Sequence, residues 1–158
     1  MTVREQSSSG ELSRPRRRPR PRCMTFLRIG LWFLAATQAG VGGWALLAPQ
    51  GFYDGFPAPG HHWVAMFPPF NEHLVRDFGA LNLGFAVALA FAAVTADRLL
   101  VQAVLAAYLT FSVPHMVFHL GHLDHMPVVD QVGNVVTLAL AVVLPVALIV
   151  VVRRRATT

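Results

Sequence analysis

Four histidines at helical spacing are the residues of this sequence that could most directly do chemistry. His115, His119, His122 and His125 follow one another at intervals of four, three and three residues. Because an α-helix turns by ~100° per residue, these intervals place the imidazoles on one helical face. Imidazole is the commonest metal ligand in proteins, and side chains one turn apart are neighbours. The run therefore suggests either a metal or haem site or histidines that form hydrogen bonds at a membrane surface.

A second group of ionisable residues opens another apolar stretch. His73 and Asp77 are one helical turn apart, with Arg76 between them. Ionisable residues inside a membrane are expensive, and their presence there is a functional hypothesis by default. Asp130 and Asn134 enter the last apolar stretch in the same way, also one turn apart. We therefore expect these side chains to face inward and to converge with the histidines of the third stretch.

This polar layer has a structural interpretation and a metal interpretation. In the first, Arg76 pairs with Asp77 or Asp130 and serves only to hold helices together. In the second, the layer binds a transition metal or a haem, as nitrogen ligands would allow. The candidate metal ligands are His73, His115, His119 and His122.

A third interpretation is a small-molecule site that faces the outer side of the membrane. An anionic or quinone-like head group would be held there by Arg76 and the polar residues near it. The candidate ligand-binding residues are Arg76, Asp77, Asp130 and Asn134. The sequence holds no visible Ser/His/Asp or Cys/His arrangement and no phosphate-binding loop, so it does not indicate whether the protein is an enzyme.

Four long apolar stretches must position these residues. They are Phe26–Ala48, Leu74–Ala96, Leu99–Leu120 and Val129–Val152. Each is long enough to cross the ~30 Å hydrocarbon core of a bilayer, which takes about 20 helical residues. The chain is 54% hydrophobic and only 13% charged, whereas a soluble domain is nearer a quarter charged. We predict an all-α fold, a membrane-embedded antiparallel four-helix bundle, with residues 24–155 as its single domain.

The distribution of arginine predicts the orientation. Arginines precede the first stretch, lie at Arg98 between the second and third, and follow the fourth at 153–155. The connecting segments 49–73 and 121–130 contain none. By the positive-inside rule, both termini are cytoplasmic and the protein lies in the bacterial inner membrane. The net charge of +5 then indicates the lipid bilayer as a partner rather than nucleic acid.

Residues 1–23 are rich in Ser, Pro and Arg and have few groups to bury. We expect them to form a disordered cytoplasmic tail. Met24 offers an alternative start, so this tail is a candidate over-extension of the reading frame. The single cysteine, Cys23, excludes an intrachain disulfide.

The segment between the first two stretches combines aromatic residues with prolines. Proline interrupts helices, and aromatic residues favour the headgroup level of a membrane. We predict an irregular flap that is either an aromatic belt or a lid over a ligand pocket. Its aromatic residues are Phe52, Tyr53, Phe56, Trp63, Phe67 and Phe70.

Small residues recur every four positions in the first two apolar stretches. Such ridges allow helix backbones to approach closely, which favours a compact bundle in a membrane. The ridges are Ala35, Ala39 and Gly43 in the first stretch and Ala80, Gly84, Ala88 and Ala92 in the second.

Three features together resemble the DoxX-like group of small bacterial four-helix membrane proteins. They are the opening FLRIGL at 26–31, the aromatic segment that follows the first stretch, and the phrase RDFGALN at 76–82. The resemblance covers about residues 25–152 and implies the four-helix membrane fold. It also implies, for some members, a place beside quinone-linked oxidoreductases, although a chain with one cysteine lacks a thiol pair for such chemistry.

We therefore expect an integral membrane protein with an outer-facing His/Arg/Asp pocket. The hypothesis favoured by the sequence is a binding or accessory subunit whose partner is a quinone-like or anionic small molecule or another membrane protein. The competing hypothesis is a metal- or haem-dependent membrane redox protein.

Overall fold

The structure is a computed structural model and describes residues 21–154. These residues form five α-helices, one short 3-10 helix and no strand, which confirms the all-α prediction. The long helices are α1 (Pro21–Leu47), α3 (Glu72–Thr95), α4 (Arg98–Leu120) and α5 (Val128–Arg154). The short elements are α2 (Pro49–Gly55) and the 3-10 helix Leu123–His125.

The four long helices coincide closely with the four apolar stretches of the sequence. Each is long and apolar enough to cross a membrane. Of the tail for which disorder was predicted, only residues 21–23 are described, and they begin α1. Residues 1–20 and 155–158 lie outside the described part of the chain.

Side-chain caps explain where two of the long helices begin. The Asn71 side chain accepts a hydrogen bond of 3.1 Å from the backbone N–H of Leu74, at the start of α3. The Asp97 side chain accepts one of 2.8 Å from the N–H of Leu100, at the start of α4. Each cap satisfies a donor that the first turn of a helix leaves free. Because Ala96 adopts a left-handed conformation (φ 49°), α3 and α4 are joined by a very short turn.

The segment 49–73 is only partly the irregular flap that the sequence predicted. Its first residues form α2, so the prediction that its prolines prevent a helix is wrong there. Pro49 occupies the first turn of α2, where the missing N–H of proline costs no hydrogen bond. Residues 56–71 are irregular, and we call this segment the strap.

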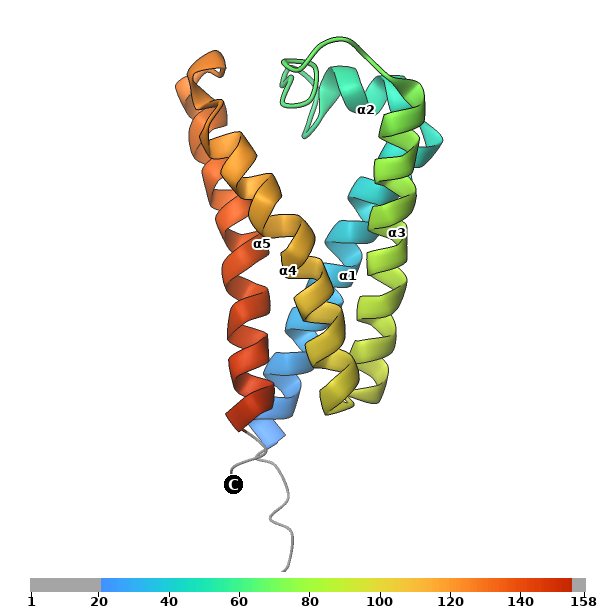
Figure 1. The fold of residues 1–158 in the computed structure, drawn as a ribbon, viewed down its shortest axis with the longest axis vertical. Helices are drawn as coiled ribbons and strands as arrows, with labels where there is room; N and C mark the ends of the chain where they lie inside the picture. Colours follow the sequence, from blue (N-terminus) through green and yellow to red (C-terminus); the bar gives the residue numbers. More distant parts are fainter. Residues whose placement is uncertain (1–20, 155–158) are drawn as a thin grey trace, which may run out of the picture.

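The long helices form two pairs that spread apart toward one end of the molecule (Figure 1). α1 lies beside α3, and α4 leans from α3 at one end toward α5 at the other. At one end, which we call the terminal end, α1 begins and α5 finishes. At the opposite loop end, α2 and the strap extend over the space between the pairs. The terminal end also holds the start of α4, and thus Arg98 as well as Arg28.

The main apolar core lies toward the terminal end, where the helix pairs meet. Leu27, Leu89, Leu105 and Leu148 come from the four long helices and are all fully buried there. A smaller cluster at the loop end joins α1, α2 and α3 through Ala45, Phe52 and Val75. Between these two clusters lies a cavity.

Candidate ligand-binding cavity

A cavity of about 590 Å³ lies between the two helix pairs. All four long helices, α2 and the strap contribute to its wall. Pockets that hold small molecules in proteins usually measure about 300–1,000 Å³. The cavity therefore has the size of a small-molecule site.

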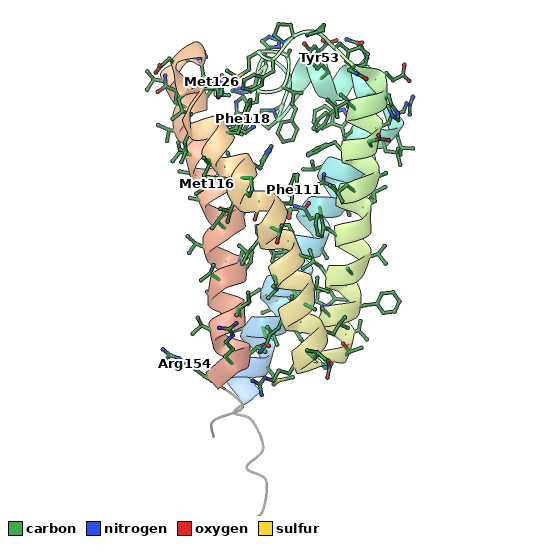
Figure 2. All side chains as sticks on the ribbon, viewed as in Figure 1. Tyr53, Phe111, Met116, Phe118, Met126 and Arg154 are labelled. Carbon is green, nitrogen blue, oxygen red and sulfur yellow. The ribbon has the colours of Figure 1, made fainter. Side chains whose placement is uncertain are left out.

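Aromatic rings form much of the wall. The Phe111 ring stacks on the His115 ring with centroids 5.3 Å apart, and Phe78 lies 6.1 Å from Phe111. Figure 2 shows Phe111 near the middle of α4 and Phe118 closer to the loop end. Trp63 and Phe67 of the strap complete the wall toward the loop end. Such a wall favours a ligand with a large apolar surface.

A few polar side chains are set into this apolar wall. The rings of His115 and His119 lie edge to face, with centroids 4.6 Å apart. Asn134 Nδ2 donates a hydrogen bond of 3.4 Å to His119 Nδ1, which links α5 to α4. Gln38 Nε2 donates one of 3.2 Å to the Tyr108 hydroxyl, which links α1 to α4. These contacts hold the polar groups in fixed positions around the cavity.

Besides Trp63 Nε1, which lies near the Asp130 carboxylate, three buried polar atoms of the wall have no hydrogen-bond partner among the described residues. They are Gln38 Oε1, Ser112 Oγ and Asn134 Oδ1, and these residues are only 9%, 4% and 2% exposed. A buried polar atom that lacks a partner costs ~1–3 kcal/mol. A bound molecule with a hydroxyl group could supply hydrogen bonds to such atoms. The cavity thus combines an apolar wall with unused hydrogen-bonding capacity.

The described residues that line the cavity include no Asp, Glu, Lys or Arg. An ion that entered the cavity would lose its hydration without meeting an opposite charge, which is strongly unfavourable. The electrostatics of the wall therefore favour a neutral molecule.

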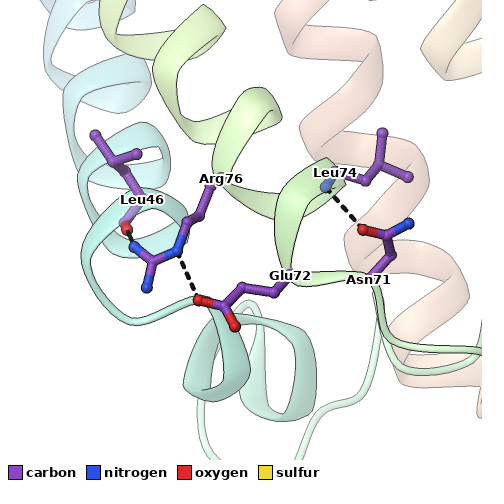
Figure 3. A network of polar contacts seen from close by, with 5 residues as sticks. All are labelled: Leu46, Asn71, Glu72, Leu74 and Arg76. Carbon is purple, nitrogen blue, oxygen red and sulfur yellow. Dashed lines mark hydrogen bonds and ion pairs between the residues drawn. The ribbon is translucent and has the colours of Figure 1, made fainter.

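Arg76 lies outside this cavity and connects two helices instead (Figure 3). Its Nε donates a 2.8 Å hydrogen bond to Glu72 Oε1, one turn earlier in α3. Its Nη1 group donates to the backbone carbonyl of Leu46, near the end of α1. The guanidinium thus satisfies a carbonyl that the last turn of α1 leaves free.

The prediction that all the polar candidates converge is wrong for the start of α3. His73 and Asp77 contact each other at 3.3 Å, but their side chains are 87% and 63% exposed. Val75 and Phe78 occupy the face of this helix that lines the cavity. Since neighbouring helical residues point ~100° apart, Asp77 cannot share the direction of Phe78.

Only three of the predicted site residues line the cavity: His115, His119 and Asn134. His122 lies nearer the loop end, where its Nδ1 donates to the carbonyl of Phe118 at 2.7 Å. In the part of the chain that the structure describes, no group of three or more His, Cys, Asp or Glu is arranged to hold a metal ion. A metal or haem at this cavity would therefore depend on the His115 and His119 pair.

Asp130 takes part in a contact that the sequence did not reveal. It is 7% exposed, and its Oδ1 accepts a 2.5 Å hydrogen bond from Nδ1 of His61 in the strap. Trp63 lies near the same carboxylate. A Cβ placed on Gly133 would come within 3.0 Å of the Trp63 ring, so this indole packs directly on α5. The strap, which leaves α2 and leads into α3, is thereby attached to the opposite helix pair.

A third attachment of the strap involves Phe67. Its ring centroid lies 5.2 Å from that of Phe118, 5.7 Å from that of His119 and 5.6 Å from that of His122. Two of the predicted histidines are thus packed against the strap. Together the three attachments make the strap a cover over the loop end of the cavity.

Comparison of this chain with protein-family models, with curated proteins and with solved structures finds no match. The resemblance to the DoxX-like group therefore rests on the sequence phrases alone. Any functional argument must start from the geometry of the cavity.

Proposed function

We propose that this protein is an integral membrane protein of the bacterial inner membrane, built as an antiparallel four-helix bundle with both termini cytoplasmic. Large apolar side chains are exposed along the long helices, as with Phe91 at 64% and Val143 at 63%. Such surfaces suit contact with lipid chains. The arginines Arg28, Arg98 and Arg153 belong to the terminal end of the bundle, in keeping with the positive-inside rule.

The proposed function is to bind a small molecule in the cavity, as a binding or accessory subunit of the DoxX-like type. One observation carries this proposal: a cavity of about 590 Å³ with an aromatic wall and three unpartnered buried polar atoms. If these residues served only stability, we would expect side chains to fill the cavity and polar atoms to be paired. Unfilled volume and unpaired polar atoms both lower stability.

The chemistry of the wall narrows the class of ligand. The structure gives no residue that would bind an anionic head group, because Arg76 bonds to Glu72 and Leu46 and does not line the cavity. A neutral, quinone-like or phenolic molecule is still compatible with the polar atoms of the wall. Its hydroxyl group could donate to Asn134 Oδ1 or Gln38 Oε1, and its oxygen could accept from Ser112.

A metal- or haem-dependent redox protein is the second candidate. The observation that favours it is the contact between His115 and His119, whose rings meet at the cavity wall. Elemental analysis and an absorption spectrum of purified protein test it. Stoichiometric metal or a haem band that disappears in both His115→Ala and His119→Ala would support this candidate, and protein free of both would contradict it.

Small brominated probes test the binding function. Bromine quenches tryptophan fluorescence on contact, and Trp63 lines the cavity. In purified protein, neutral 4-bromophenol should quench saturably, whereas 4-bromobenzoate, an anion, should not. 4-Bromotoluene, which lacks the hydroxyl, should bind about tenfold more weakly, since an unmatched buried polar atom costs ~1–3 kcal/mol.

A pair of variants on α5 provides the matched control. Asn134→Leu removes an unpartnered carbonyl of the wall and should reduce the preference for 4-bromophenol over 4-bromotoluene. Gln131→Leu changes a side chain of the same type that bonds to the Met126 carbonyl and does not line the cavity. It should leave the preference unchanged. Unsaturable quenching, or equal affinity for all three probes, would contradict the proposed function.

A further inference from the structure

The loop end is a poor entrance to the cavity, because the strap is attached across it. The His61 side chain bonds to Asp130, and Trp63 packs on the backbone of Gly133. Phe67 lies against Phe118 and His119 of α4. A molecule that entered from this side would have to break these contacts first.

The side of the bundle between α3 and α4 is crossed by a set of aromatic rings, although Leu74 at the loop end of α3 also lines the cavity and is 65% exposed. Phe78, Phe111 and His115 form a continuous set of ring contacts there, with centroid separations of 5.3 to 6.5 Å. Phe85 extends this set with a centroid 6.1 Å from that of Phe111. These rings obstruct the α3–α4 side around Phe111 and His115, whereas no ring contact joins α1 to α5 among the described residues.

We call the line along which α1 and α5 face each other the seam. It is closed toward the terminal end and open nearer the loop end. Toward the terminal end, a Cβ on Gly30 would lie 2.8 Å from a methyl group of Leu148, so the two helices are in direct contact. Farther along, Phe33 of α1 and Leu140 of α5 line the cavity and are each 45% exposed. Residues that face both the cavity and the outside mark an opening.

Two threonines belong to the same part of the seam. Thr37 of α1 and Thr137 of α5 line the cavity and are exposed. At 1.5 Å per residue, Thr37 lies about 15 Å from the end of α1 at Leu47. That depth is near the middle of a hydrocarbon core about 30 Å thick. In a membrane, the opening would therefore face lipid chains and not water.

We propose that the cavity is loaded sideways from the membrane, through the α1–α5 seam, by a neutral lipid-soluble molecule that carries a hydroxyl-bearing head and an apolar tail. The proposal rests on the membrane-embedded binding function proposed above. The head passes Thr37 and Thr137 and reaches Ser112 and Asn134, whose buried polar atoms lack partners among the described residues. The tail stays beside Phe33 in the seam, in contact with lipid. A water-soluble molecule has no access at this depth.

Leu140 allows a test in which two substitutions act in opposite directions. The probe is 4-bromophenol that carries a dodecyl chain, and the protein is held in phosphatidylcholine nanodiscs. Trp32 and Trp44 are replaced by Phe, so that recovery of Trp63 fluorescence reports release of the probe into excess empty vesicles. Leu140→Phe narrows the seam and should slow release by about tenfold, which corresponds to ~1.4 kcal/mol of added barrier. Leu140→Ala widens the seam and should accelerate release.

Val136→Phe is the matched control, because Val136 lies one turn earlier on α5, is 60% exposed and does not line the cavity. It should leave the release rate unchanged. A rate that responds to neither Leu140 substitution, while the probe still binds, overturns the sideways route and leaves the binding function standing. Faster release in His61→Ala would then assign the route to the loop end. Failure of the parent protein to bind the probe overturns the binding function and this inference with it.

Discussion

Gly42 of α1 and Gly79 of α3 form the point at which two helix backbones touch. A Cβ on Gly42 would lie 2.7 Å from the carbonyl oxygen of Gly79, and a Cβ on Gly79 would lie 2.6 Å from the backbone nitrogen of Leu46. Real Cβ atoms do not approach backbone so closely, so only glycine fits at either position. This contact fixes the α1–α3 pair and, with it, one wall of the cavity.

Substitution of Gly79 by alanine should therefore force the helices apart. We expect Gly79→Ala to lower the free energy of unfolding by ~1–3 kcal/mol, as overpacking does in other interiors. Gly84→Ala is the control on the same helix, because no described heavy atom outside the local helix lies within 4 Å of a Cβ there. It should be neutral or stabilising. Thermal unfolding in one detergent compares the two, and equal effects would contradict the role given to Gly79.

The attachment of the strap gives a second prediction. His61→Ala leaves the buried Asp130 carboxylate without its 2.5 Å hydrogen bond and should destabilise the protein by about 1 kcal/mol. Asp130→Asn should cost less when His61 is already absent, which a double-mutant cycle measures as coupling. His62→Ala is the neighbouring control, since the His62 imidazole bonds to the Asp54 carbonyl, makes no hydrogen bond to Asp130 among the described residues and lies at the surface. Strictly additive effects at positions 61 and 130 would show that the contact contributes nothing.

Ser112 should show opposite effects on stability and binding. Its hydroxyl is buried without a partner among the described residues, so Ser112→Ala should be neutral or should stabilise the ligand-free protein by up to ~1 kcal/mol. The same change should weaken 4-bromophenol binding, so the probe raises the unfolding temperature of the variant less. Thr110→Ala, at an exposed hydroxyl that bonds to the Ala106 carbonyl, should not alter the response to the probe. A Ser112→Ala variant that binds 4-bromophenol as tightly as the parent would show that Ser112 does not contribute to binding.

The helices could be predicted because their signal is local. Length, hydropathy and flanking arginines gave four long apolar helices, and the Asn71 and Asp97 caps lie where the chain enters two of them. Side-chain direction within a helix could not be predicted so well. The small-residue ridges named Gly43 and Gly84, yet Gly42 and Gly79 make the close approach. Several glycines and alanines share each helix, and the sequence does not say which face meets the neighbour.

Only some residues of the candidate site could be predicted, again because the sequence does not give the direction of a side chain around its helix. His115, His119 and Asn134 were found because polar residues are rare in such long apolar stretches and therefore conspicuous. Arg76 and Asp77 were grouped with them by depth, but depth does not specify direction around the helix. The contact between His61 and Asp130 joins positions 69 residues apart, and no periodicity in the sequence pairs a loop residue with a helix that follows much later.

The proposed topology is open to a direct test. A reporter that works only in the cytoplasm should be active when fused after Thr158, because Arg98 and Arg153 belong to the end of the bundle at which α1 begins and α5 finishes. A reporter that works only after export should be active when inserted at Gly60, in the strap. An exported carboxyl terminus would contradict the proposed orientation.

Arg76 should prove structural, in contrast to the ligand-binding role that its place in the sequence suggested. Its guanidinium reaches the Glu72 carboxylate and the Leu46 carbonyl at once, which requires a forked donor. We expect Arg76→Ala to lower the free energy of unfolding by ~1–2 kcal/mol and Arg76→Lys to restore only part of it. Neither variant should change the affinity for 4-bromophenol, because Arg76 does not line the cavity. Asp77→Ala, at the exposed neighbour, should alter neither quantity. Loss of probe binding in a stably folded Arg76→Ala protein would show that Arg76 contributes to ligand binding.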